Sequence, residues 1–343
     1  MLATISRDDI RAQQQVDELL RREGIRRDRN LDYTCGIFDD AGNLIATGSC
    51  FGNTLRCFAV SNEHQGEGLL NQVLGHLMEV QVARGNTHVF LYTKPRNVKF
   101  FEDLGFYEIA AVDGTLVFME NRRNGFASYL ARFGKNRSAT PSAAVVMNAN
   151  PFTRGHRYLV ERAAADFGRV HLFILSENAG PIPAQVRGKL AREGVADLPN
   201  VVCHDSGPYI ISAATFPSYF LKDEDAAIQA HAALDLTLFA RIADALGVTC
   251  RYVGEEPTSH VTALYNQIMA EKLPTLGIRC KMIPRLEIGG RIVSASTVRQ
   301  AIHDGNLEGI ADMLPETTLR YFRSPEAAPV IAAICVSDDV IHY

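Results

Sequence analysis

The sequence predicts an α/β protein of two domains, with strands and helices mixed in the first domain and alternating in the second. Its 343 residues, of which 47% are hydrophobic and 22% charged, are enough to bury two cores. Residues 1–120 begin with a hairpin pattern, whereas residues 143–343 alternate short apolar runs with helical periodicity. Between them, residues 121–142 lose periodicity and end in RSATPS, which is typical of a connector.

The first domain is expected to be rich in strands. The runs LDYTCGIF and LIATGSCF flank DDAGN, a turn sequence that suits a β-hairpin. The chain then reads as a strand TLRCFAV, a glycine-bearing loop NEHQGEG, a helix LLNQVLGHLMEVQVARG and a strand HVFLYT. This order predicts a β-loop-helix-β unit within a mixed α+β domain.

In the second domain, strands and helices are expected to alternate as they do around an open parallel sheet. The expected strands are AAVVMN, VHLFILS, VVCHDSG and TCRYVGEE, and the expected helices are RYLVERAAADF, VRGKLAREGVADL and a helical middle segment. Because crossover helices make neighbouring strands parallel, the pattern predicts a Rossmann-like parallel α/β domain.

Charge, cysteine content and hydropathy disfavour several classes of protein. The net charge of −4 gives no basic field for nucleic acid or an anionic membrane. The seven cysteines are odd in number and lack CxxC spacing, so they are expected to be reduced core residues. The sequence has neither a signal-like apolar region at its start nor a stretch long enough to span a bilayer. A cytoplasmic protein is therefore expected.

The first strand of the second domain runs into the string NANPFTRGH. In a parallel sheet, the first strand-to-helix turn offers free backbone N–H groups and a helix dipole to an anion. Gly155 would let the backbone approach a phosphate, while Thr153 offers a hydroxyl and His156 a ring N–H. The turn predicts an anion site, although an ordinary helix start with a surface histidine also fits these few residues.

A second string, GGRIVSASTVRQAIHDG, opens a late helix. Ser294 and Ser296 are expected as its N-caps, and Arg299 is expected in its first turn. Taken alone, the string fits an ordinary capped helix with a solvated arginine. Together with the earlier T-x-G-H turn, S-x-S-x-x-R resembles the paired signature of the nucleotidyltransferase superfamily, in which both motifs flank a triphosphate.

The chain also resembles the citrate lyase ligase family over nearly its whole length. The strings that carry the resemblance are MNANPFTRGHRYLVERAA, SGPYIISAATFPSYFLK, RYVGEEP, TALYNQIM, LPTLGI, IPR and SASTVR. The resemblance implies an AMP-forming acid–thiol ligase that acts through acetyl-AMP. Its substrates would be ATP, acetate and the thiol of a dephospho-coenzyme-A-type group on the acyl carrier subunit of citrate lyase. Mg²⁺ is the expected counter-ion of ATP, with no metal site formed by the protein alone.

The residues expected around ATP belong to the two motifs and to a few further positions. Thr153, His156 and Arg299 are the expected catalytic residues, since they would neutralise charge on the α-phosphate and the departing pyrophosphate. The other expected ATP-binding residues are Asn148, Asn150, Gly155, Lys222, Gly254, Glu255, Ser294 and Ser296. Turn chemistry, a solvated lysine and an exposed acidic loop are the alternatives for the asparagines, Lys222 and Gly254–Glu255. No general base is expected, because acetate is already ionised at neutral pH.

The first domain resembles the coenzyme-A-binding fold of GNAT-type acetyltransferases. NEHQGEGLLNQVLGHLM is similar to their pyrophosphate loop, Q-x-x-G-x-G/A, and NVKFFEDLGF to their F-F-x-x-L-G-F ending. Leu70 departs from the loop pattern, which usually has glycine or alanine there. The hypothesis is that Gln65, Gly66, Gly68 and Asn97 hold the pantetheine arm of the carrier protein. The alternative is a structural relic or docking platform.

Three other functions fit parts of the sequence. The two nucleotidyltransferase motifs also fit another adenylyltransferase, such as one that adenylates phosphopantetheine. The first domain also fits an N-acetyltransferase that uses acetyl-coenzyme A, and the whole chain fits a nucleotide-responsive module without catalysis. Whether acetate or a phosphomonoester triggers pyrophosphate release separates the ligase from the first of these.

Overall fold

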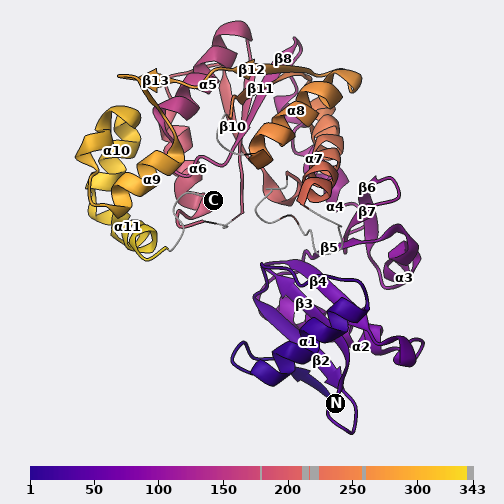
Figure 1. Cartoon of the computed structure of the whole chain (residues 1–343). Helices are drawn as coiled ribbons and strands as arrows, with labels where there is room; N and C mark the ends of the chain where they lie inside the picture. Colours follow the sequence, from indigo (N-terminus) through magenta and orange to yellow (C-terminus); the bar gives the residue numbers. More distant parts are fainter. Residues whose placement is uncertain (178–179, 211–215, 217–223, 257–259, 338–343) are drawn as a thin grey trace. The chain divides into compact units, whose positions relative to one another are not determined.

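The computed structural model describes residues 1–177, 180–210, 216, 224–256 and 260–337. The chain divides into two compact units, Met1–Ala127 with Phe216–Ala230, and Ser128–Thr215 with His231–Tyr343. Figure 1 shows their helices and strands, of which α4 (Gly125–Ala131) and α7 (Glu224–Leu246) run from one unit into the other. Within the described residues, no helix combines the length and apolar character that a membrane crossing requires.

The first unit is built on a seven-stranded sheet with the order β1-β2-β3-β4-β5-β7-β6. Its strands are β1 (Leu2–Thr4), β2 (Tyr33–Phe38), β3 (Leu44–Phe51), β4 (Thr54–Val60), β5 (Phe90–Thr93), β6 (Tyr107–Val112) and β7 (Leu116–Glu120). All neighbours are antiparallel except β4 and β5. These two parallel strands pair only at Thr54–Phe90 and Leu55–Leu91, so they part beyond Leu55.

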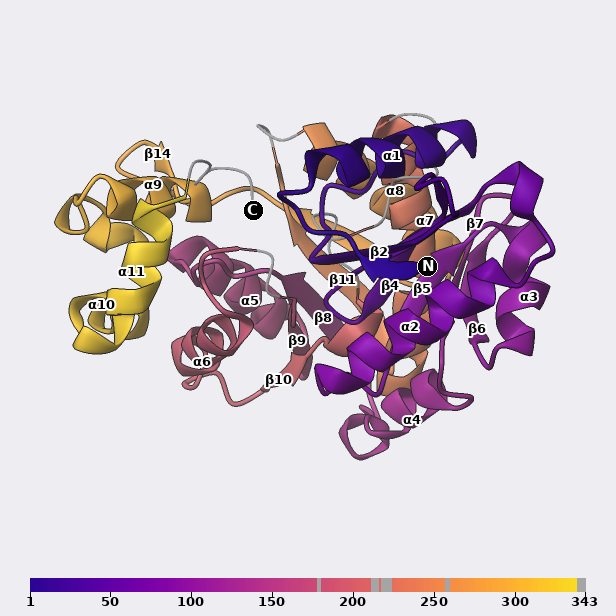
Figure 2. The same cartoon turned by 90° about the horizontal axis from the view of Figure 1, so that it is seen from below.

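Helices cover both faces of this sheet (Figure 2). α1 (Ile10–Arg22) begins after Asp9, whose side chain accepts a hydrogen bond from the Ala12 amide. α2 (Leu69–Ala83) connects β4 to β5, and α3 (Val98–Asp103) follows β5. The apolar side chains of α1 and α2 pack into separate clusters, because each helix buries one stripe against its own face of the sheet. The expected mixed α+β class of the N-terminal part is confirmed.

The second unit contains a five-stranded parallel sheet with the order β10-β9-β8-β11-β12. Its strands are β8 (Ser142–Met147), β9 (Val170–Ile174), β10 (Val201–Asp205), β11 (Val248–Gly254) and β12 (Arg279–Ile283). β8 is the first strand in the sequence and the central one in space, and the order reverses between β8 and β11. The expected parallel α/β class is confirmed, and this reversal is where open sheets of this kind bind ligands.

Helices lie on both faces of the parallel sheet (Figures 1 and 2). α5 (Arg154–Asp166) and α6 (Ala184–Gly194) cover one face, and α8 (His260–Thr275) with the second unit's part of α7 covers the other. A small hairpin of β13 (Glu287–Ile288) and β14 (Arg291–Ile292) follows β12. The crossover helices cover the apolar side chains on both faces of the sheet, while the backbone groups of each inner strand pair with the neighbouring strands.

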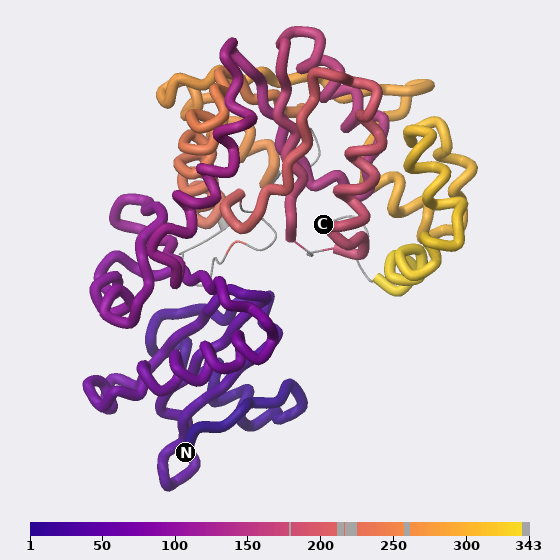
Figure 3. The backbone as a smooth tube through the Cα atoms, turned by 180° about the vertical axis from the view of Figure 1, so that it is seen from behind, coloured from indigo at the N-terminus to yellow at the C-terminus, as the bar shows by residue number. Residues whose placement is uncertain are grey.

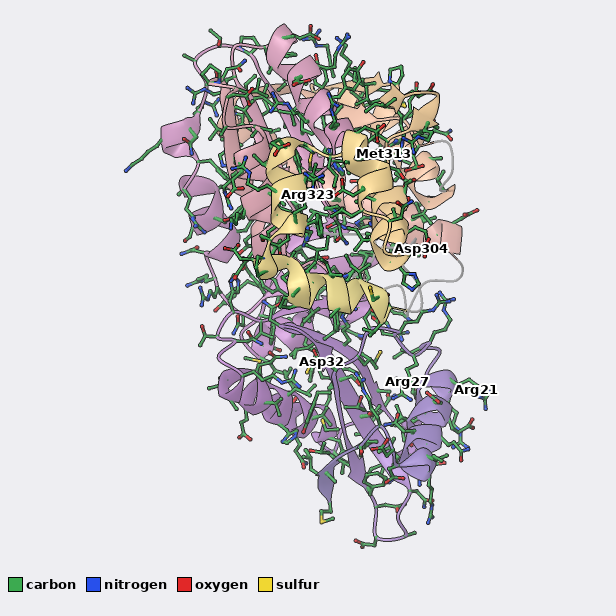
Figure 4. The ribbon with its side chains drawn as sticks, turned by 90° about the vertical axis from the view of Figure 1, so that its left-hand side faces the viewer. Arg21, Arg27, Asp32, Asp304, Met313 and Arg323 are labelled. Carbon is green, nitrogen blue, oxygen red and sulfur yellow. The ribbon has the colours of Figure 1, made fainter. Side chains whose placement is uncertain are left out.

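Three short helices at the end of the chain extend the core on the α5–α6 face (Figure 3). They are α9 (Ala295–His303), α10 (Glu316–Arg323) and α11 (Ala328–Cys335). In the side view of Figure 4, Asp304 at the end of α9 and Arg323 on α10 lie on the surface, and both are exposed. Met313, between these two helices in the sequence, is buried in the same core as α5 and α6.

The seven cysteines are all free thiols, as expected. Cys35, Cys50, Cys57 and Cys250 are buried, and burial raises the pKa of each thiol. Cys335 is exposed, so the expectation of a core position is wrong for that residue.

Two buried histidines face each other across β9 and β10. Nδ1 of His171 lies 2.9 Å from Nε2 of His204, and the His204 ring stacks on Phe173 and meets Phe133 edge-on. Burial lowers the pKa of each histidine from 6.5 to about 4, so both are neutral at pH 7. Because folding keeps both histidines neutral, the stability of the second unit depends on pH through this pair.

We expect the second unit to lose stability as the pH falls from 6.5 toward 4. In this window the unfolded histidines bind protons and the folded pair does not, so protons favour unfolding by about 2 kcal/mol per histidine at pH 5. Replacing the pair, as His171→Leu with His204→Phe, should flatten this part of the profile. Urea unfolding between pH 7 and 4.5 measures it, with His303→Ala as the exposed control. An unchanged slope in the double variant would contradict the assignment.

Candidate functional site

The candidate site lies at the carboxyl edge of the parallel sheet, where the order reverses between β8 and β11. β8 continues into the turn at residues 148–153 that opens α5, and β11 ends at Gly254. The third segment at the site is the start of α9. All three segments belong to the second unit, and they contain both sequence motifs.

Thr153 and His156 fix each other at the N-terminus of α5. The Thr153 hydroxyl accepts a hydrogen bond from the His156 amide at 3.3 Å, and the Thr153 amide donates to Nδ1 of His156 at 3.0 Å. The same hydroxyl lies 2.9 Å from Nδ1. Because Nδ1 accepts from the backbone, a neutral His156 carries its proton on Nε2. The capping box thus selects one tautomer of the ring.

His156 is uncharged near neutral pH. The protein around it excludes water and, with the positive charges of Arg285 and Arg299, lowers the pKa of His156 from 6.5 to about 4. The ring stacks on the buried Phe152 at a centroid distance of 5.8 Å and keeps a partly exposed face. Within the described chain, no residue accepts a hydrogen bond from Nε2. That N–H is therefore available to a ligand as a neutral donor.

Ser294 caps the N-terminus of α9, where its hydroxyl accepts from the Thr297 amide at 3.0 Å. The expectation that Ser296 is a second N-cap is wrong, because Ser296 is already helical and a helix start has one cap position. Its hydroxyl lies 3.0 Å from that of Ser294. Arg299 lies in the second turn instead of the first and is only 2% exposed, so it is not a solvated side chain.

The starts of α5 and α9 meet, although they are far apart in the sequence. A Cβ atom on Gly155 would lie 3.1 Å from the carbonyl oxygen of Val293, tighter than side chains ordinarily pack. Gly155 is needed for this close approach and not for an unusual φ angle. Arg299 donates from Nη1 to the carbonyl oxygen of Asn150, which links α9 to the turn after β8. The two motifs therefore form one site by direct contact.

The two asparagines of the turn are held in different ways. The backbone and side-chain oxygens of Asn148 accept hydrogen bonds from Arg187 of α6, at 2.6 and 2.5 Å. Asn150 is 3% exposed, and in the described part of the chain its side-chain oxygen has no hydrogen-bond partner. Because buried polar atoms are nearly always paired, the Asn150 oxygen indicates a position for a donor group of a ligand.

Gly254 and Glu255 form the β11 side of the site. The Gly254 carbonyl accepts from Asn266 of α8 at 3.0 Å. The Glu255 carbonyl accepts from Nε of Arg285 at 2.8 Å, and Arg285 is also ion-paired with Glu256. The Glu255 residue is exposed overall. The structure thus uses the backbone of Glu255 to hold an arginine close to His156.

Two arginines at the site were missed by the sequence analysis. Arg285 stands in the string IPR directly after β12, a position at the same carboxyl edge, and this placement was the available signal. Arg187 gave no signal, because an arginine in an amphipathic helix usually extends into solvent. Its contact with Asn148 exists only in the folded chain.

The remaining expected residues are Lys222 and four residues of the first unit. Lys222 lies outside the described residues. In the first unit, Gly66 and Gly68 have φ angles of +90° and +72° in the exposed loop that opens α2, and Gln65 donates to Asn62 in that loop at 2.7 Å. Asn97 is exposed and follows β5. Because β4 and β5 are parallel, the two loops follow strand ends at the same edge of the sheet.

The site as a whole is suited to a polyanion. Arg187 and Arg299 supply positive charge, whereas the charge of Arg285 is shared with Glu256. The helix starts of α5 and α9 add partial positive charge. Among the residues that the structure describes, no group of three or more His, Cys, Asp or Glu side chains is placed to hold a metal ion. Fixed donors and cations of this kind stabilise charge that develops on phosphate groups.

Comparisons with known proteins agree with this geometry. Residues 142–322 match the family model described as the citrate lyase ligase C-terminal domain. A citrate (pro-3S)-lyase ligase from Escherichia coli is 36% identical over 93% of this chain and 93% of its own length. The corresponding ligase from Haemophilus influenzae is 34% identical over 90% of this chain and 94% of its own length.

Solved structures also resemble part of the chain. An aminoglycoside 6'-N-acetyltransferase complexed with coenzyme A covers 35% of this chain and 95% of its own length, with 13% identity and a TM-score of 0.32. The assignment of the family rests on the sequence relatives and on the family model, which together span both units. The chain belongs to the citrate lyase ligase family.

Proposed function

We propose that this enzyme activates citrate lyase by acetylating the thiol of a dephospho-coenzyme-A-type prosthetic group on the acyl carrier subunit of the lyase. ATP and acetate are the co-substrates, and AMP and pyrophosphate are the other products. The observation that supports this proposal most directly is the meeting of the α5 and α9 starts at the sheet reversal, in a chain of this family. Helix starts and buried arginines of this kind favour the binding of a triphosphate.

In the first step, an acetate oxygen bonds to the α-phosphorus of ATP as the bond to the pyrophosphate oxygen breaks, giving acetyl-AMP. Thr153, Gly155 and His156 would bind the α- and β-phosphates, with Nε2–H of His156 donating to a phosphoryl oxygen. Ser294, Ser296 and Arg299 would bind the β- and γ-phosphates. The other residues proposed to contact ATP are Asn148, Asn150, Lys222, Gly254, Glu255 and Arg285.

The chemistry of this step requires charge neutralisation and alignment, not a base, because acetate arrives ionised. The neutral His156 suits a donor role, since it neither accepts nor releases a proton near pH 7. Mg²⁺ is proposed as the counter-ion of the triphosphate. Phosphate oxygens and water would hold it, in agreement with the few carboxylates at the site.

In the second step, the thiol sulfur bonds to the acetyl carbonyl carbon, AMP leaves, and the thiol proton passes to solvent. We propose that residues 1–120 form a domain that holds the pantetheine arm through Gln65, Gly66, Gly68 and Asn97. Residues 121–142 would connect it to the nucleotidyltransferase domain at 143–343. Support comes from the glycine loop at the start of α2 and from the loop after β5, which share one edge of the sheet.

Acetate-dependent ATP–pyrophosphate exchange tests the first step. His156→Ala and Arg299→Ala should each reduce the exchange rate at least about a hundredfold, because each removes a donor to a charged phosphate. The matched controls are His303→Ala and Arg320→Ala, which change exposed residues of α9 and α10. Exchange that needs no acetate, or that survives in both site variants, would contradict adenylation of acetate at this site.

The protonation state of His156 gives a second test. In the free protein, ¹⁵N NMR of labelled histidine should show the Nε2–H tautomer, with a pKa of about 4. As the pH falls through that value, Nδ1 gains a proton and can no longer accept from the Thr153 amide, so the capping box opens. The pH profile of kcat/KM should therefore show no change near pH 6.5 that is due to His156. An Nδ1–H tautomer, or titration near 6.5, would overturn the assignment.

The role of the first unit is tested by Gly68→Trp. A bulky side chain in the glycine loop should abolish acetylation of the carrier thiol while acetyl-AMP still forms. Gly114→Trp is the matched control, since Gly114 also has a positive φ and open space around it, but lies in the β6–β7 turn. Acetyl-AMP formation is followed by pyrophosphate release, and thiol acetylation by mass measurement of the carrier. Equal loss of both steps in Gly68→Trp would contradict the proposal.

A further inference from the structure

Arg187 is a buried cation directly beneath the candidate ATP site. It is 1% exposed and lies in the first turns of α6. Its guanidinium donates to the carbonyl oxygens of Asn148, Ile182 and Glu177, and to the side-chain oxygen of Asn148. The side chain therefore joins the end of β8 to the segment that leads from β9 to α6.

The charge of Arg187 is only partly balanced, because the Glu177 carboxylate favours it from a distance without a direct bond to it. Within the described chain, no Asp or Glu side chain forms an ion pair with it, and its acceptors are carbonyl and amide oxygens. Burial lowers the pKa of Arg187 to about 10, which leaves the group charged at neutral pH. A buried charge without a directly bonded counter-ion is costly, and its position at the start of α6 adds to the cost, because helix N-termini are themselves positive. An anion bound at the adjacent site would offset this cost.

Arg187 also decides which way the Asn148 amide points. A guanidinium can only donate, so the atom that it contacts is the amide oxygen and not the amide nitrogen. The nitrogen Nδ2 of Asn148 must then face away from Arg187. No described residue accepts a hydrogen bond from it, and Asn148 is partly exposed at the end of β8. Two N–H groups are thus presented at the sheet edge where the phosphates are proposed to lie.

We infer that Arg187 is a positioning residue for triphosphate binding, which holds the Asn148 amide with its N–H groups toward the phosphates while its buried charge attracts them. This inference rests on the proposed ATP site. It assigns Asn148 the role of a donor to phosphate. An asparagine near a proline can also serve only to form the turn. That role does not require an arginine at the side-chain oxygen of the asparagine.

A purely structural role for Arg187 would have different consequences. If Arg187 only ties the segment between β9 and α6 to β8, changing it lowers the melting temperature and weakens all nucleotides alike. If Arg187 acts through Asn148 on the phosphates, its loss weakens the binding of ATP more than the binding of AMP. The effects of changing Arg187 and Asn148 would then not add, because both remove the same interaction.

The test is nucleotide binding by calorimetry to the full chain and to four variants. Arg187→Lys keeps the charge but replaces the planar guanidinium by a single nitrogen, so it cannot keep the bonds to Asn148, Ile182 and Glu177 together and no longer fixes the Asn148 amide. Asn148→Ala removes the group that is positioned. The third variant combines them. Arg192→Lys is the matched control, because Arg192 lies on the same helix, half exposed and ion-paired with Asp205. The probes are ATP and AMP with Mg²⁺, and the melting temperature of each variant is recorded.

We expect Arg187→Lys and Asn148→Ala each to weaken ATP about tenfold, a typical loss for a hydrogen bond to a charged group, with less than about threefold for AMP. The double variant should bind ATP no more weakly than the weaker single variant, and Arg192→Lys should bind as the wild type. Three results would each overturn the inference. They are unchanged ATP binding in Asn148→Ala, losses of ATP affinity that add in the double variant, and equal losses of affinity for ATP and AMP. If Arg187→Lys does not fold, Asn148→Ala alone decides by the ATP-to-AMP comparison.

These outcomes are separate from those of the proposed function. A wild-type protein that binds ATP but shows no acetate-dependent exchange would contradict the ligase reaction and leave the role of Arg187 open to the same measurements. Exchange that is lost in His156→Ala but unchanged in Asn148→Ala would support the reaction and overturn the inference about Arg187.

Discussion

The second unit depends on the close approach between Gly155 at the start of α5 and the Val293 carbonyl just before α9. Two helix starts that lie close together can share one ligand, and a side chain on Gly155 would press against the Val293 carbonyl. The contact also carries Arg299 to the turn after β8, where it bonds to Asn150. The parallel sheet supplies the place for this meeting, because its reversal leaves the ends of β8 and β11 uncovered by a crossover.

Around this contact, the site combines charged donors with neutral ones. The arginines bring the positive charge, whereas His156 is kept neutral by burial and by the charges of Arg285 and Arg299. The Thr153 amide then determines which ring nitrogen carries the proton. At neutral pH His156 thus has one charge and one tautomer. Its donor N–H is therefore in place before any substrate arrives. Preorganised donors of this kind need little rearrangement as charge develops during reaction.

The sequence predicted those parts of the structure that local chemistry decides. Alternating apolar runs indicated the parallel sheet, and Ser294 occupies the cap position that was expected for it. The capping role of Thr153 was not predicted, although its hydroxyl favours that position. The burial of Arg299 was not predictable, because it depends on a carbonyl from a distant turn. Arg187 was missed for the same reason, since its acceptors come together only when α6 packs against β8. In the first unit, the hairpin of β2 and β3 was evident, but the parting of β4 and β5 is a property of non-local pairing.

The depth of Arg187 and Arg299 has a consequence for how salt affects this protein. Dissolved ions screen charges that they can surround, and side chains that are 1% and 2% exposed are closed to them. Attraction between these two guanidinium groups and a bound polyphosphate therefore weakens little as ionic strength rises. A site built from surface lysines would lose much of its affinity under the same conditions. Nucleotide binding at the proposed site would thus tolerate changes in the ionic strength around the protein.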